Sequence, residues 1–136
     1  NEITEYLRRD ILNCALRNTD NHGRNTALFK LADARVLLTP LYDFAPMFLD
    51  PEGIPRSSRW ANDLEATIGR PDWGAIVSTL SGVIDADMLR STLYRDADTV
   101  ARLPETMSAC GVEASVIERL AQRCNDIATD LRALKG

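Results

Sequence analysis

The chain has 136 residues, of which 16 are Lys or Arg and 20 are Asp or Glu, so its formal net charge at pH 7 is −4. The negative charge argues against direct nucleic-acid binding through electrostatics, and no apolar run approaches the roughly 18 to 20 residues that cross a bilayer. We therefore expect no membrane association and a single domain over residues 1–136. The three cysteines lack CxxC spacing, which favours free thiols in a reducing cytoplasm.

The first predicted element is a helix over residues 2–17. Apolar side chains recur in it at helical spacing, at Ile3, Leu7, Ile11 and then Cys14 or Ala15. Acidic residues come early in this segment and basic residues come late, as the helix dipole favours. We expect a buried helix that delivers the chain to the polar loop behind it.

That loop is the polar stretch Asn-Thr-Asp-Asn-His-Gly-Arg-Asn at residues 18–25. It contains too many turn-forming residues to continue the helix, so it is predicted to be a structured loop. Gly23 is expected to supply an unusual backbone angle within it.

A short hairpin is predicted next, with strands over residues 26–31 and 36–39. Its return strand should bring Asp43 back beside Asn25. Residues 42–48 are apolar apart from Asp43, so its carboxylate is expected in a partly dry setting. An unpaired buried carboxylate is costly, which favours a metal or a cationic partner there.

The order of the polar groups indicates phosphoryl transfer. Protein kinases use an Asp, an Asn five positions later, and an Asp-Phe pair after a short β segment. In that arrangement Asp20 would orient or accept the proton of the substrate hydroxyl, while Asn25 and Asp43 would hold Mg²⁺ on the ATP phosphates. Mg²⁺ takes hard oxygen ligands and needs no His or Cys. His22 is a second catalytic candidate, either as a base or as a residue that hydrogen-bonds the loop backbone and holds Asp20 in place.

The sequence around these residues resembles the C-terminal half of HipA-like serine/threonine kinases, the toxin halves of bacterial toxin-antitoxin pairs. Residues 18–25 match the family signature Asn-Thr-Asp-x-His-x-x-Asn, and residues 39–48 continue the likeness with Thr-Pro-Leu-Tyr-Asp-Phe-Ala-Pro-Met-Phe. The resemblance implies that Asp20 is catalytic and that Asn25 and Asp43 are metal ligands.

The resemblance also implies a fold and partners. The expected fold is mainly α (α+β): the C-terminal lobe of a protein kinase, with helices and a short β-hairpin that carries the metal-binding Asp43. Implied partners are ATP, Mg²⁺, a protein substrate such as an aminoacyl-tRNA synthetase, and a DNA-binding antitoxin. The chain itself would contact DNA only indirectly, through that antitoxin. Kinases also need a Gly-rich loop and a strand lysine, which this chain lacks. We expect a fragment of a longer protein, folded but nearly inactive by itself.

Two other functions compete with the kinase hypothesis. A pseudokinase or protein-interaction module would keep the fold without transferase activity, but the intact Asp20, Asn25 and Asp43 count against it. A metal-dependent phosphohydrolase would use the same oxygen ligands, although such sites usually add further carboxylates or histidines for two metals.

A proline-rich loop follows and ends in Arg-Ser-Ser-Arg-Trp at residues 56–60. Arg56 and Arg59 either contact substrate or phosphate, or belong to a solvated basic loop that Trp60 anchors, and the solvated loop is the favoured interpretation. Ser57 and Ser58 are candidate phosphoacceptors.

The rest of the chain is predicted to be helical. Asp72 should open a helix that runs to about residue 80, and Asp85 should cap a longer one that Pro104 breaks or kinks. The last helix, over residues 113–134, carries a heptad stripe that either packs in its own domain, as we favour, or forms a dimer seam. The cysteines are expected as free thiols, each on the apolar side of a helix: Cys14, Cys110 and Cys124.

Overall fold

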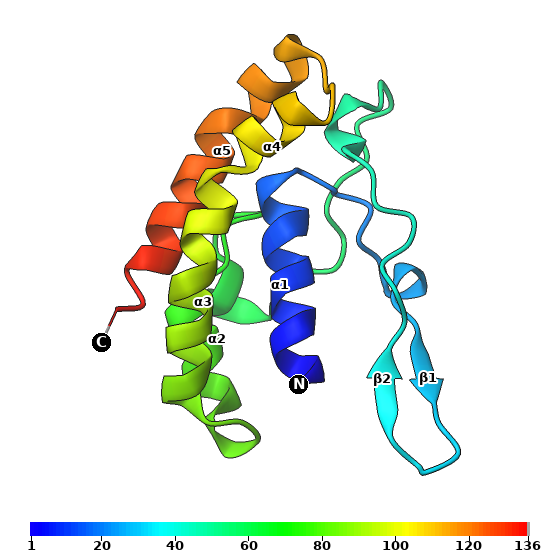
Figure 1. Ribbon diagram of the computed structural model, residues 1–136, viewed down its shortest axis with the longest axis vertical. Coiled ribbons are helices and arrows are strands. Elements are labelled where there is room, and N and C mark those ends of the chain that lie inside the picture. Colours follow the sequence, from blue (N-terminus) through cyan, green and yellow to red (C-terminus); the bar gives the residue numbers. More distant parts are fainter. Residues whose placement is uncertain (136) are drawn as a thin grey trace.

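The protein is mainly α-helical in the computed structural model, which describes residues 1–135 and, at residue 62, the backbone alone (Figure 1). Its helices are α1 (Glu2–Ala15), α2 (Trp73–Thr79), α3 (Ala86–Ala101), α4 (Leu103–Ala109) and α5 (Ala114–Arg132). The strands are β1 (Leu28–Lys30) and β2 (Val36–Leu38). Short 3-10 turns occupy the connections: η1 (Gly23–Asn25), η2 (Met47–Leu49), η3 (Asn62–Glu65) and η4 (Leu80–Gly82). The predicted mainly α (α+β) class is confirmed.

The hydrophobic core lies between α1, α2, α3 and α5, which run beside one another in Figure 1. Its largest fully buried side chains are Trp73, Leu7, Ile11, Ile76, Leu89, Leu93, Leu120, Ile127 and Leu131. The heptad stripe of α5 is part of this core and packs mainly against α3. Of the two interpretations of that stripe, packing within its own domain is therefore confirmed.

The helix boundaries follow local signals in the sequence. Asp72 caps α2 by accepting a hydrogen bond from the backbone N–H of Ala75 at 2.9 Å, and Asp85 caps α3 by accepting one from Met88 at 2.8 Å. Pro104 lies in the first turn of α4, directly after α3 ends. All three predicted boundary residues act as expected, because each effect depends on neighbours within one turn.

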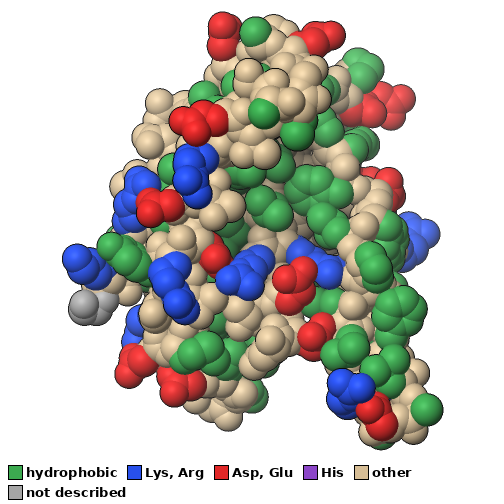
Figure 2. Space-filling model, viewed as in Figure 1, with side chains coloured by type: hydrophobic (Ala, Val, Ile, Leu, Met, Phe, Trp, Pro, Cys, Tyr) green, Lys and Arg blue, Asp and Glu red, His purple; other side chains and the backbone are tan. Residues whose placement is uncertain are grey.

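The hairpin extends beside α1 and away from the helical core (Figure 1). Its register pairs Leu28 with Leu38 and Lys30 with Val36. The backbone N–H of Leu38 donates to the carboxylate of Glu2, which ties β2 to the start of α1. Leu28, Phe29 and Val36 remain about half exposed or more, and Figure 2 shows hydrophobic side chains gathered along the hairpin.

The cysteine prediction is only partly correct. All three cysteines are free, and Cys14 and Cys124 are buried, but Cys110 is exposed. Cys110 follows the last residue of α4, at the turn into Gly111, and so lies past the helix rather than on its apolar side. Within residues 1–135, no helix combines the length and the apolar character that a bilayer crossing requires.

Candidate functional site

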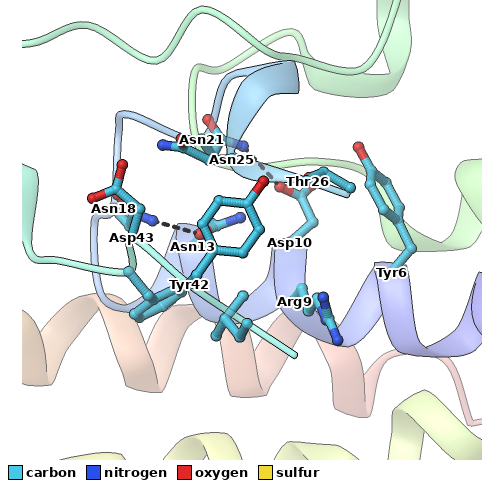
Figure 3. Close-up of a pocket in the computed structure, with 12 residues that line it drawn as sticks. Tyr6, Arg9, Asp10, Asn13, Asn18, Asn21, Asn25, Thr26, Tyr42 and Asp43 are labelled. Carbon is cyan, nitrogen blue, oxygen red and sulfur yellow. Dashed lines mark hydrogen bonds between the residues drawn. The ribbon is translucent and has the colours of Figure 1, made fainter. Parts of the chain in front are cut away.

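A small polar pocket forms where α1, the loop 18–25 and the chain after β2 meet (Figure 3). It is lined by Tyr6, Arg9, Asp10, Asn13, Asn18, Asn21, Asn25, Thr26, Leu41, Tyr42, Asp43 and Phe44. Its cavity volume is about 30 Å³, which holds a water molecule or a metal ion but no nucleotide. A larger ligand would have to lie over its mouth.

Local hydrogen bonds shape the loop side of this pocket. The side-chain amide of Asn18 donates to Asn13 Oδ1 at 2.9 Å, and its backbone N–H donates to the Asn13 carbonyl at 2.9 Å. The latter bond closes the end of α1 with Arg17 in the left-handed region, at φ 52°. The hydroxyl of Tyr42 donates to the Arg24 carbonyl at 2.8 Å, which fastens the chain after β2 to the loop.

The structure brings together the two residues predicted to bind metal, because Asn25 and Asp43 line the same pocket. Asn25 Nδ2 donates to the backbone carbonyl of Asp20 at 2.8 Å. This bond fixes the orientation of the amide and leaves its oxygen, the atom a cation would take, free of that interaction. The positions fit the prediction, while the metal-binding roles themselves stay predictions.

The surroundings predicted for Asp43 are wrong. Its side chain is exposed rather than in a partly dry setting, because its neighbours Leu41 and Tyr42 are themselves exposed and do not shield it. Its backbone is unusual instead, with φ at 51° in the left-handed region. Asp tolerates that conformation better than most residues. Gly23 does not have the unusual backbone angle expected of it and begins the 3-10 turn η1.

Asp20 and His22 lie beside each other but do not line the pocket. His22 Nε2 is 3.5 Å from Asp20 Oδ1, and both side chains are about one-third exposed. His22 Nδ1 is buried and has no partner within the described residues, so the expected hydrogen bond to the loop backbone is not formed by that atom. The loop backbone at Asp20 is instead held by Asn25.

The loop also concentrates unpaired polar atoms. Within the described part of the chain, its buried side-chain atoms without a partner are Asn18 Oδ1, Thr19 Oγ1, Asn21 Oδ1 and His22 Nδ1. Leaving such an atom unsatisfied costs about 1–3 kcal/mol. Their concentration in one loop calls for polar partners there, such as ordered water, an ion or a polar ligand.

A buried charge network borders the pocket, and the sequence interpretation missed it. Arg56 donates to Glu65 at 2.8 Å and to Asp10 at 3.0 Å, and all three side chains are almost fully buried. The favoured interpretation of a solvated basic loop is therefore wrong for Arg56, whereas Arg59 is exposed and Trp60 anchors the loop by donating to Asp10. A signal existed, because Asp10 falls on the buried side of α1 beside Leu7 and Cys14, where a carboxylate needs a cation.

The pKa values in this network follow from burial and pairing. Burial raises the pKa of Asp10 above its ordinary value, against the opposing effect of Arg56 and of the Trp60 hydrogen bond. Burial works to raise the pKa of Glu65 as well, but hydrogen bonds from Arg56 and from the backbone of Gly69 and Trp60 outweigh it, so the pKa is lowered. Glu65 is thus firmly held as a carboxylate.

Fold and site together define a mainly helical domain whose polar loop and hairpin return build one small oxygen-rich pocket. The chain belongs to the family of HipA-like C-terminal domains, whose family model matches residues 1–130. This confirms the resemblance seen in the loop and the Tyr-Asp motif. Neither a curated protein nor a solved structure matches the chain significantly.

Proposed function

We propose that this chain is the catalytic and Mg²⁺-binding half of an ATP-dependent serine/threonine protein kinase, the toxin component of a toxin-antitoxin pair. One observation carries the proposal: Asn25 and Asp43, from two separate segments, line one pocket in a domain of the HipA-like family. HipA proteins are usually toxin-antitoxin kinases, and this membership suggests kinase activity in the full protein.

The side chains present fit a magnesium ion. Within residues 1–135, no three His, Cys, Asp or Glu side chains converge on a common point. Mg²⁺ does not require such a cluster, since it is commonly bound through one or two carboxylates together with phosphate oxygens and water. Asn25 Oδ1 and the Asp43 carboxylate would hold it, and the exposed position of Asp43 keeps one side open to phosphates. The ion would neutralise charge on the transferred phosphoryl group.

The other loop residues would act on the substrate hydroxyl. In the proposed reaction, the Asp20 carboxylate orients that hydroxyl and accepts its proton as the phosphoryl group is transferred. The bond from Asn25 to the Asp20 carbonyl fixes the backbone that presents this carboxylate. His22, at 3.5 Å from Asp20, would limit the rotation of the carboxylate.

The proposed partners are a protein substrate, with an aminoacyl-tRNA synthetase as the kind of target, and a DNA-binding antitoxin. The net charge of −4 supports contact with DNA only through the antitoxin. A cytoplasmic location is part of the same proposal.

The test is phosphate transfer from labelled ATP with Mg²⁺ by the full-length protein that contains this chain. Asp20→Asn and Asp43→Ala should each lower kcat/KM by more than about a hundredfold, as the loss of a catalytic or metal group does. Asp33→Asn is the matched control, because Asp33 pairs with Arg35 at the exposed tip of the hairpin, and it should retain full activity. Folded wild-type protein that transfers no phosphate would refute the proposal and favour an interaction module.

A further inference from the structure

We infer that Asp10 is a positioning residue that couples the candidate catalytic loop 18–25 to the segment 56–69, an inference that rests on the proposed kinase function. Asp10 belongs to α1 and is only 5% exposed. One of its oxygens accepts a hydrogen bond from Asn21 in the loop at 3.3 Å. Its other oxygen accepts bonds from Trp60 Nε1 at 2.8 Å and from Arg56 at 3.0 Å. One buried carboxylate thus joins three parts of the chain.

The segment 56–69 is held together as one unit by Glu65. Its carboxylate accepts hydrogen bonds from the Arg56 side chain at 2.8 Å, from the backbone N–H of Trp60 at 3.0 Å and from that of Gly69 at 2.7 Å. A displacement of any of these groups therefore moves the others. Among the described atoms, which at residue 62 are those of the backbone alone, every hydrogen-bonded link from this unit to the loop passes through Asp10.

The loop end of the link lies next to the proposed chemistry. Asn21 directly follows Asp20, so the bond from Asn21 to Asp10 limits rotation of the peptide that carries the proposed catalytic carboxylate. Asn25 restrains the same peptide from the other side through the Asp20 carbonyl. A shift of about 1 Å in a catalytic group can cost about a hundredfold in rate. Asp10 would accordingly influence the rate of transfer without touching ATP or substrate.

Because the link is buried, a displacement at one end should be passed on to the other. Asp10 and Glu65 share one guanidinium in a nearly dry setting, where a displaced partner cannot be replaced by bulk water. A purely exposed ion pair would not transmit such a displacement. Arg8 and Asp96 provide that contrast. Arg8, on the same helix as Asp10, donates two hydrogen bonds to Asp96 of α3, but its side chain is 46% exposed.

The experiment compares Asp10→Asn, Trp60→Phe and the matched control Asp96→Asn in the full-length protein. Asp10→Asn keeps the size of the side chain but loses the charge, and should lower kcat by about 10- to 100-fold while the KM for ATP changes less than about threefold. Trp60→Phe removes the N–H that reaches Asp10, together with part of a ring that packs against Tyr6 and the core, and should lower kcat by about 3- to 10-fold. Asp96→Asn should leave both parameters unchanged.

Backbone hydrogen exchange gives a second readout that does not need catalysis. Within the described part of the chain, Trp60 makes no hydrogen bond to the loop. Trp60→Phe should nevertheless speed amide exchange across residues 18–25, including the hydrogen-bonded amide of Asn25. Exchange that changes only within residues 56–69 would overturn the inference, whether or not the protein transfers phosphate. So would an equal loss of activity in Asp96→Asn. If folded wild-type protein transfers no phosphate, the kinase proposal is refuted. The exchange data would still decide whether Asp10 couples the loop to the segment 56–69.

Discussion

The two sides of α1 are built on different physical principles. Toward α3 and α5 the helix presents Leu7, Ile11 and Cys14, which are buried in the apolar core. Toward the loop it presents Asp10 and Asn13, whose side chains are hydrogen-bonded to residues far along the chain or across the helix end. One helix therefore supports both the core and the candidate site.

The difference matters because the two kinds of contact tolerate change differently. Apolar packing is non-directional, and each buried side chain contributes roughly 1.5–3 kcal/mol. A buried hydrogen-bonded charge contributes little net stability when intact and costs several kcal/mol when one partner is removed. The core side of α1 should accept conservative changes, whereas the site side should not.

The largest predicted effect is on the site side. Arg56→Ala removes the cation shared by Asp10 and Glu65 and should lower the free energy of unfolding by about 3–5 kcal/mol. Urea denaturation measures it. Arg70→Ala, which breaks an exposed pair with Asp130, is the control and should cost no more than about 1 kcal/mol. Equal costs for the two variants would contradict the idea that burial sets the energy of this network.

The core side is tested by Leu7→Ala. Leu7 is fully buried, so its truncation should cost about 2–5 kcal/mol through lost transfer energy and the cavity left behind. Leu49→Ala is the control, because Leu49 is 40% exposed in η2, and it should cost less than about 1 kcal/mol. Thermal or urea unfolding of the two variants measures these costs. A cost for Leu7→Ala near that of Leu49→Ala would mean that this side of α1 is not core.

The pH dependence of stability separates Glu65 from the rest of the network. Because the pKa of Glu65 is lowered in the folded protein, its contribution is present above its ordinary value of 4.5 and is lost as pH falls through the folded pKa. Wild-type protein should thus lose stability on acidification below pH 4.5 more steeply than Glu65→Gln. The raised pKa of Asp10 acts in the opposite direction, mainly through burial, which both proteins share. The Glu65 charge also contributes to it, so the difference between the two curves should be smaller than the Glu65 contribution alone. Parallel stability curves would contradict the assignment.

Much of this architecture could be predicted because it depends on local sequence. The caps Asp72 and Asp85 act on backbone groups three residues away, and the stripe of α5 is readable from spacing alone. The sequence motifs and the predicted hairpin also indicated that Asn25 and Asp43 would lie side by side, and both residues do line one pocket.

The wrong predictions share one cause: each concerns a feature that depends on contacts with residues distant in the sequence. The apolar residues around Asp43 gave no information about which of them are covered, and Leu41 and Tyr42 are exposed whereas Phe44 is partly buried. Arg56 has the composition of a solvated loop around it but is buried by Asp10 and Glu65. Gly23 was expected to have an unusual backbone angle, but the positive φ angles beside the pocket are at Arg17 and Asp43.

The smallest predicted effect is for Arg8→Ala, on the α3 side of α1. Arg8 donates two hydrogen bonds to Asp96, at 2.7 and 3.0 Å, but its side chain is 46% exposed. The pair should therefore contribute about 0–1 kcal/mol, measured by urea unfolding. Its ionic part should shrink between about 0.05 and 1 M NaCl as the Debye length shortens. Any remainder at high salt would come from the aliphatic stem of Arg8, which lines one hollow with Leu12 and Val100.

The salt dependence is what makes this last variant informative. A small cost that fades with salt would leave apolar packing as the basis of the α3 side, and directional buried hydrogen bonds as the basis of the site side. A cost above about 2 kcal/mol that persists at high salt would exceed what an exposed pair supplies. The α3 side would then also depend on a specific ion pair, and Asp96→Asn could no longer serve as the neutral control for Asp10→Asn.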